Sequence, residues 1–383
     1  MAQAANGPDL LPAFGSAKGE QWFRTAFKWK LNEIIKWLDD ASNGRTGGPR
    51  SKDPDVQKLL KDALSKIKAL ASPNGTNYTN PEPKSHFPRS VNGDWSDSVD
   101  KKTVSRFKLH EWPGIYRRGP KDAELRVPYW NPYDLLGLFL SLLGPAPVEA
   151  TKSNYFLPLT AVYARWCARI AGKAPPAYKY PDGEKGTGAG NWPFMFQCTW
   201  HDDRSKKPLK WFFLGASISG DEFKEDNVGA WKRTVQLHRF NMMYACFQVK
   251  MLRTGDFENQ RAPEQRIAGG SQVPFGNCAE TYPFVEKMFR DKVKNTELYG
   301  LALKRDFMRD INRVQEYDGS PQGVIWGNLV GPCRNCATLI KWSGGVKENF
   351  GIEVDEPRAA QGQTDTIGGA DKAKEKGAAV LVK

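Results

Sequence analysis

Cysteine and histidine are scarce in this chain, which has six cysteines and four histidines in 383 residues. Six cysteines are far below the density of a small secreted scaffold held together by disulfides. The four histidines show none of the spacings at which imidazoles share a metal ion, which leaves them core or surface roles. These shortages argue against a disulfide-rich extracellular module, and they predict that the thiols are reduced.

Long hydrophobic runs are also missing. The most apolar stretch is residues 135–144 (LLGLFLSLLG), and a membrane-spanning helix needs about 20 apolar residues. We therefore predict a buried helix there. The first twenty residues lack the basic and apolar segments of a secretory signal peptide. We expect an intracellular protein, in the cytoplasm or nucleus, that does not contact a membrane.

What the chain does have is hydrophobic material and positive charge. Hydrophobic residues make up 40% of the sequence, with 13 tryptophans, so a folded core is expected. The formal net charge is +13. Such a surplus suits a polyanionic partner such as DNA or RNA, and a well-solvated surface explains it equally well.

The first half of the chain has the periodicity of helices. Apolar residues recur at three- and four-residue spacing over 19–42 and over 54–72, and Pro54 suits a first helical turn. Two more helices are predicted at 132–144 and 154–172. The tryptophans of the first helix are expected in the core rather than as a platform for stacking bases. Residues 72–130 are irregular by composition, and the Pro- and Gly-rich segment 173–193 is predicted to be a linker.

The second half mixes the two kinds of element. Strands are predicted at 208–219, 297–305 and 323–330, and helices at 228–253, at 277–291 and after residue 332. This pattern predicts an α/β fold. We divide the chain into a mainly helical N-terminal region (1–200), a second domain (205–350) and a disordered tail (351–383).

One short cysteine motif reads GPCRNC, in which Cys333 and Cys336 follow Pro332 at the predicted start of a helix. The free N–H groups at a helix N-terminus lower thiol pKa values, and thiolates are good zinc ligands. A C-x-x-C pair alone is compatible with half of a zinc site, a redox pair or coincidence.

A second motif, Cys278-Ala279-Glu280, narrows these options. If its helix start converges with that of the C-x-x-C pair, three thiolates bind one zinc ion and leave a coordination position open, as in catalytic sites. Glu280 is too close in sequence to Cys278 to join easily as a fourth ligand. It is well placed to take and return protons beside the metal.

Two other interpretations of these cysteines remain open. They could be buried thiols without metal, or they could form a closed structural zinc site with His238 or Cys246 as the fourth ligand. The other three cysteines lie in apolar, aromatic surroundings and are expected to be core residues: Cys167, Cys198 and Cys246.

Together, CAE and PCRNC resemble the C-x-E and P-C-x-x-C signature of the zinc-dependent cytidine deaminase-like superfamily, in a divergent microbial or fungal-type branch. The resemblance covers about residues 205–350. It implies a mixed sheet with flanking helices and the two motif helices side by side under one sheet edge. It also implies Zn²⁺ bound by Cys278, Cys333 and Cys336, with Glu280 as the proton shuttle. The spacing between the motifs predicts an insertion around residues 304–321.

The same resemblance implies a hydrolase acting on C–N bonds. Zinc-bound hydroxide would attack the amine-bearing carbon of a nucleobase, cytosine as first choice and adenine as second, and ammonia would leave. The substrate would be a nucleoside or a single-stranded nucleic acid. Arg334 is a candidate cation beside the thiolates or an exposed residue. Four aromatic residues near the motifs are candidates for stacking a base or for the core: Phe275, Tyr282, Phe284 and Trp326. The alternative function is a non-catalytic, zinc-stabilised binding module or a nucleic-acid-binding protein.

Overall fold

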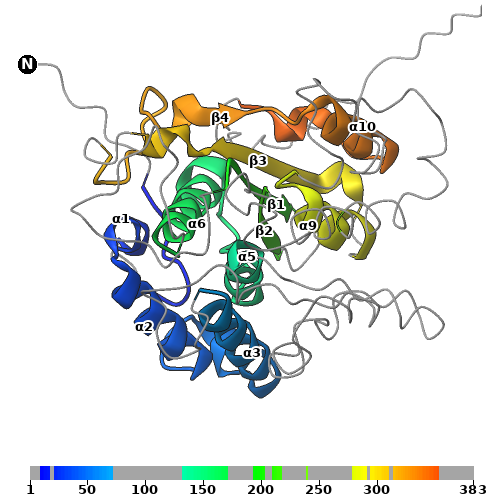
Figure 1. Ribbon diagram of the computed structural model, residues 1–383. Helices are drawn as coiled ribbons and strands as arrows, with labels where there is room; N and C mark the ends of the chain where they lie inside the picture. The colour runs from blue at the N-terminus through cyan, green and yellow to red at the C-terminus, as the bar shows by residue number, and fades with distance from the viewer. Residues whose placement is uncertain are drawn as a thin grey trace, which may run out of the picture.

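The computed structural model in Figure 1 describes residues 9–17, 21–71, 132–170, 193–202, 209–217, 239, 278–290, 294–309 and 314–352. These residues form one sheet with helices on both sides. A single hydrophobic core runs from the first helices to the segment after the last one. Five of the six cysteines are described, and all five are free thiols.

Four strands make the sheet in the order β2-β1-β3-β4. They are β1 (Met195–His201), β2 (Phe212–Ala216), β3 (Leu298–Lys304) and β4 (Leu329–Val330). Every described pairing is antiparallel, which corrects the mixed sheet that the resemblance implied. The physical reason lies after β3. There the chain turns at Arg305–Met308 and comes back along the same strand, with Leu329 opposite Leu303.

Strand β1 at the centre of the sheet was not predicted. Its residues alternate between two faces, with Phe196, Cys198 and Trp200 on one and Gln197 and Thr199 on the other. This alternation of residues could have indicated a strand. It was overlooked because it directly follows a segment with the composition of a linker. β1 falls within the region assigned to residues 1–200, and it pairs with β2 and β3 from beyond that boundary. The division of the chain into domains stays a prediction.

Helices α5 (Pro132–Leu142) and α6 (Leu157–Ile170) cover the apolar face of the sheet. The ring of Phe156, just before α6, stacks on Trp200 at 4.0 Å, and Tyr163 meets Phe196 edge-on at 5.7 Å. All residues of α6 are buried, as expected for a helix that is apolar nearly all round. The predicted helices at 132–144 and 154–172 are confirmed, including the buried apolar run.

Small residues on the other face of the sheet let the motif elements approach closely. Gly215 of β2 lies under the Ala279 carbonyl, and Gly300 of β3 lies against the ring of Phe350. This face carries α9 (Thr281–Phe284), its continuation η7 (Val285–Arg290) and η11 (Lys347–Phe350). The sheet therefore separates the N-terminal helices from the first cysteine motif.

The helix predicted over 19–42 is two helices, α1 (Trp22–Lys28) and α2 (Leu31–Ser42). The break gives α2 its own start, where the backbone amide of Lys30 donates to the Glu33 carboxylate at 2.8 Å. It also turns Trp29 inward, where its ring stacks on Trp166 with centroids 5.5 Å apart. Trp22 and Trp37 join this cluster and are buried core residues as predicted, while Trp29 is partly buried and packs against the core.

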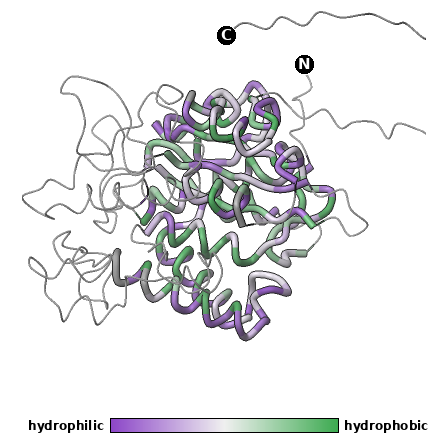
Figure 2. Tube along the Cα trace, turned by 90° about the vertical axis from the view of Figure 1, so that its right-hand side faces the viewer, coloured by the Kyte–Doolittle hydropathy of each residue, from purple (hydrophilic) through white to green (hydrophobic). Residues whose placement is uncertain are grey.

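Helix α3 (Pro54–Ala71) confirms the prediction for 54–72, with Pro54 as its first residue. It packs against α2 and α5 at the bottom of the molecule (Figure 1). The hydropathy of the chain alternates along these lower helices in Figure 2, as amphipathic helices require.

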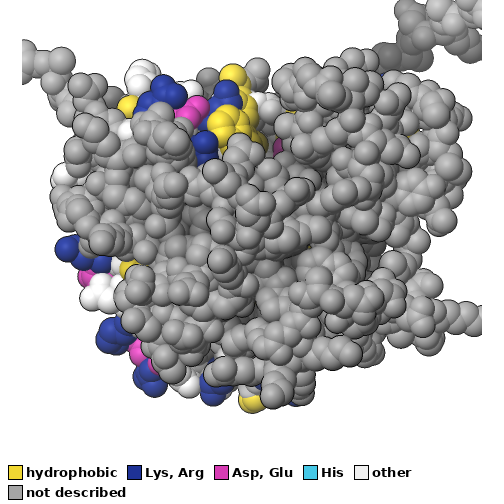
Figure 3. Space-filling view, in the orientation of Figure 1, with side chains coloured by type: hydrophobic (Ala, Val, Ile, Leu, Met, Phe, Trp, Pro, Cys, Tyr) yellow, Lys and Arg dark blue, Asp and Glu magenta, His cyan; other side chains and the backbone are white. Residues whose placement is uncertain are grey.

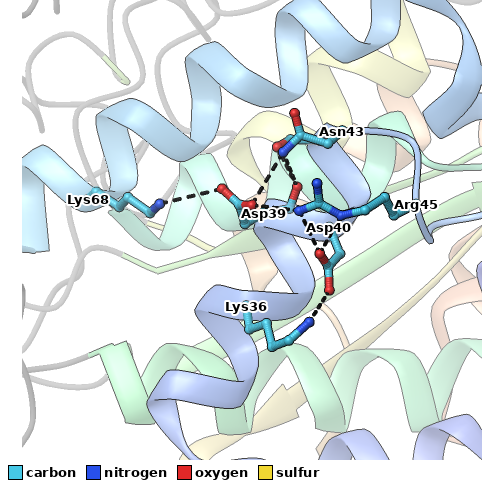
Figure 4. Close-up of polar contacts among 7 residues, drawn as sticks. Lys36, Asp39, Asp40, Asn43, Arg45 and Lys68 are labelled. Atoms are coloured by element: carbon cyan, nitrogen blue, oxygen red, sulfur yellow. Dashed lines mark hydrogen bonds and ion pairs between the residues drawn. The ribbon is translucent and has the colours of Figure 1, made fainter.

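A cluster of charged side chains holds the end of α2 (Figure 4). Asp39 and Asp40 lie at the negative end of the helix dipole, an unfavourable place for carboxylates. Arg45 contacts both, at 2.9 and 2.7 Å, while Lys36 reaches Asp40 at 2.6 Å and Lys68 of α3 lies 3.8 Å from Asp39. Hydrogen bonding by Lys36 and then Arg45 lowers the pKa of Asp40. Charges of both signs also lie beside one another along this lower edge in Figure 3.

Several predictions fall outside the described residues. They concern the irregular segment 72–130, the linker at 173–193 except its last residue, the helix over 228–253 except one residue, and the tail 351–383 except its first two residues. Of the insertion predicted around 304–321, only residues 310–313 lie outside the described part of the chain. Arg239, the one described residue of that helix, is helical and buried. None of the described helices has the length and apolar content to cross a membrane.

The close approach at Gly215 gives a testable prediction. A Cβ there would lie 2.4 Å from the Ala279 carbonyl oxygen and 2.6 Å from Pro283 Cδ, closer than real contacts allow. Gly215→Ala should therefore lower the free energy of unfolding by about 1–3 kcal/mol, the usual cost of overpacking. Denaturant titration measures it. Gly327→Ala is the control, because nothing lies within 4 Å of a Cβ at that position. Equal stability of both variants would contradict the packing described.

Candidate metal centre

The first cysteine motif forms a tight turn that leads into a helix. Cys278, Ala279 and Glu280 precede α9, and the carbonyl of Cys278 accepts a hydrogen bond of 2.9 Å from the Thr281 hydroxyl. The amide of Phe284 donates to the Glu280 carbonyl at 2.8 Å, which starts the helical pattern. The helix predicted over 277–291 is confirmed in position, although its second half has the wider π-helical winding.

The second motif caps another helix. β4 leads through Pro332 to Cys333, which is the N-cap of α10 (Arg334–Trp342). The Cys333 sulfur accepts the backbone N–H of Cys336 at 3.5 Å, in the way that a serine or aspartate oxygen caps a helix. Only two residues of the strand predicted over 323–330 are extended. Residues 326–328 form a 3₁₀ turn.

The two motifs meet. The sulfur atoms of Cys278, Cys333 and Cys336 all lie within 4.8 Å of one another. In tetrahedral zinc sites, with Zn–S bonds near 2.3 Å, ligand sulfurs are roughly 3.8 Å apart. A small inward movement would therefore let all three bind one thiophilic metal ion, and the residues fit such a group. Cys336 is buried and Cys333 is exposed, so the cluster lies at the surface.

The three sulfurs share protons unequally. Hydrogen bonds from Cys278 and then Cys336 hold the pKa of the Cys333 thiol well below its ordinary value, helped by the backbone amides at the start of α10. The same contacts with Cys333 raise the pKa of Cys278. For Cys336, hydrogen bonding to Cys278 is the largest cause of a raised pKa and hydrogen bonding to Cys333 the second. The cluster thus favours a Cys333 thiolate, and a bound metal would require the other two thiols to release protons as well.

Glu280 lies beside the sulfur cluster without belonging to it. Its side chain is 7% exposed. Burial raises its pKa to about 7, and the Cys333 sulfur adds to the rise, while hydrogen bonding to its own backbone amide and to Cys336 opposes it. Within the described part of the chain, the metal-ligand cluster contains only these three sulfurs and no fourth thiol, imidazole or carboxylate. The arrangement is a three-thiol cluster with a carboxyl group at its side that is poised to gain or lose a proton near neutral pH.

The structure settles part of the remaining sequence predictions. Cys167 and Cys198 are fully buried core residues, as predicted. Three of the four aromatic candidates are buried and belong to the core rather than to an open stacking surface: Tyr282, Phe284 and Trp326. Phe275, His238 and Cys246 lie outside the described residues, as does the side chain of Arg334, whose backbone begins α10.

One residue behind the site was missed by the sequence reasoning. Arg239 is fully buried, and its guanidinium donates a hydrogen bond of 2.7 Å to the carbonyl of Cys278. The signal was available, because Arg239 interrupts the apolar residues of VQLHRFNMMYACF within a predicted helix. A charge in such a run indicates a buried polar partner.

Fold and site together define an α/β protein with an antiparallel sheet and a three-cysteine cluster that could hold a metal ion. No family model, curated protein or solved structure matches this chain.

Proposed function

We propose that this protein is a zinc-dependent hydrolytic deaminase that acts on a nucleobase. The observation that carries the proposal is the position of Glu280, a buried carboxyl group beside three sulfurs that lie within 4.8 Å of one another. A structural zinc site needs four protein ligands and no proton-transfer group. Three ligands with an adjacent carboxyl group are the composition of a hydrolytic site.

The roles of the residues follow from their chemistry. Cys278, Cys333 and Cys336 would bind the zinc ion through their sulfurs. Zinc held in this way acts as a Lewis acid at its open coordination position and makes water there more acidic. Glu280 would accept one proton from the attacking water and pass it to the ring nitrogen of the base. It would then accept the second proton of the same oxygen and deliver it to the departing amine, which would leave as ammonia.

The environment of Glu280 is suited to proton transfer. A proton shuttle functions best when its pKa is close to the working pH, because both protonation states must be accessible in one cycle. Burial raises the Glu280 pKa to about 7, from an ordinary carboxyl value of 4.5. Burial also shields the carboxyl group from exchange with bulk water.

The substrate class is an amine-bearing base, cytosine first and adenine second. The net charge of +13 favours a base that is carried on a phosphate backbone, so single-stranded nucleic acid is proposed alongside the nucleoside. Tyr282, Phe284 and Trp326 are buried, so these three candidates offer no stacking surface for several bases. The substrate is therefore proposed to present a single base to the cluster.

Ammonia release tests the proposal. The zinc-loaded protein should release ammonia from at least one member of a panel of cytosine- and adenine-containing nucleosides, nucleotides and single strands. Single-stranded DNA that contains neither cytosine nor adenine is the control. Stoichiometric zinc without ammonia release from the whole panel would instead support a non-catalytic, zinc-stabilised module.

A further inference from the structure

Arg239 connects three parts of the molecule behind the cysteine cluster. Its Nη1 donates to Asp134 Oδ2 of α5 at 3.0 Å. Its Nη2 donates to the carbonyl of Ala216, at the end of β2, at 3.1 Å and to that of Cys278 at 2.7 Å. One side chain thus contacts a helix of the N-terminal region, the edge strand of the sheet and the first metal-binding motif.

The ion pair between Arg239 and Asp134 is unusual because both side chains are buried. The two side chains are 0% and 1% exposed, and no other ion pair in the described part of the chain has both partners buried. Removing two charges from water is costly, and a well-packed apolar pair is often as stable. Apolar residues could not make the three hydrogen bonds that Arg239 makes at this position.

These hydrogen bonds orient the Cys278 backbone. A guanidinium is planar and rigid, so a contact to Asp134 on one nitrogen fixes the direction of the other. The ring of Tyr282, the second residue of α9, has its centroid 4.9 Å from the guanidinium carbon and contacts the guanidinium from a second side. The carbonyl of Cys278 is held from behind while its sulfur lies with Cys333 and Cys336 on the other helix.

We infer that Arg239 is a positioning residue of the metal centre, and that Asp134 makes helix α5 part of that centre. Arg239 sets the distance of the Cys278 sulfur from the C-x-x-C pair, and with it the placement of Glu280 two residues on. The inference rests on the metal-binding half of the proposed function, namely that the three cysteines bind one ion. It does not depend on deamination.

The test measures metal affinity of the full chain with zinc alone, by competition with a chelator. Arg239→Lys keeps the charge opposite Asp134 but replaces the fork with one ammonium that cannot reach both carbonyls. Zinc affinity should fall by roughly 10–100-fold, the usual effect of losing a group that orients a metal ligand. Cobalt substitution gives a second readout, because the visible spectrum of the variant should lose tetrahedral character.

Arg165→Lys is the matched control. Arg165 is also a buried arginine that donates to a backbone carbonyl, that of Phe27 at 3.3 Å, with its guanidinium over an aromatic ring. It lies on α6, on the opposite side of the sheet from α9. This variant should lose stability in denaturant titrations to a similar degree and keep native zinc affinity. A merely structural Arg239 would behave in the same way as Arg165.

Zinc affinity within twofold of the native value in folded Arg239→Lys would overturn the inference, whether or not the protein deaminates any base. If Arg239→Lys does not fold, Asp134→Asn tests the same link from its other end. It removes the charge that fixes Nη1 while leaving Arg239 in place, and it should also weaken zinc binding. Unchanged affinity in that variant would likewise overturn the inference. A native protein that binds zinc but deaminates nothing would refute only the proposed function.

Discussion

Glu280→Gln is expected to keep zinc and the native fold and to lose deamination by about 10²–10⁴-fold, the usual contribution of a positioned proton-transfer group. Glutamine has nearly the same shape and fits the same buried space, so packing should change little. It cannot accept a proton near neutral pH. The variant therefore tests the proton-transfer role of Glu280 without disturbing the fold. Glu280→Ala should be equally inactive, and also less stable because a buried side chain is shortened.

Glu286→Gln is the control for this experiment. Glu286 is a second buried glutamate, on η7, which continues the motif helix. Its replacement should leave the rate of ammonia release close to native. Loss of zinc from Glu280→Gln would instead make Glu280 a metal ligand and the site a structural one. Full activity with bound zinc would place the proton transfer on another residue.

Cys333→Ser is expected to abolish tight zinc binding. An alcohol is a far weaker ligand for zinc than a thiolate, and the two remaining sulfurs cannot complete the site. Because Cys333 is exposed, the exchange of sulfur for oxygen should cost little stability in itself. Any larger loss would come through the metal, which stabilises by about 4 kcal/mol when present at 1,000 times its dissociation constant. Denaturant titrations with and without chelator measure it.

Cys167→Ala should show the reverse pattern. Cys167 is fully buried in α6, so its shortening leaves a small cavity and lowers the free energy of unfolding by about 1–2 kcal/mol. Zinc content should stay native. If Cys333→Ser retains zinc, or if chelation leaves the stability of the native protein unchanged, the three cysteines are not a metal centre.

Several elements of the fold and of the site were predicted correctly from local sequence patterns. Proline before Cys333 predicted the start of α10, and the structure confirms the cysteine as its N-cap. The apolar spacing over 54–72 and the run at 135–144 predicted α3 and α5 correctly. In each case one short stretch of chain contains the determinant, whether a cap, a period or an apolar run.

The features that the sequence did not predict depend on contacts between segments that are distant in the sequence. The antiparallel course of β4 is set by the return of the chain after β3, which no period within residues 323–330 encodes. At the break between α1 and α2, Trp29 stacks on Trp166, which lies more than a hundred residues away in the sequence. Arg239 gains its role only because folding brings Asp134 and Cys278 to its two nitrogens. Local propensity does not contain such pairings.

Elemental analysis of the 383-residue chain, purified without chelator, tests the central claim most directly. The three convergent sulfurs predict about one zinc ion per chain. They also predict loss of that ion in Cys333→Ser and its retention in Cys167→Ala and Glu280→Gln. Native protein with no bound zinc, and with no uptake of zinc after reduction of its thiols, would contradict the metal centre and the deaminase built upon it.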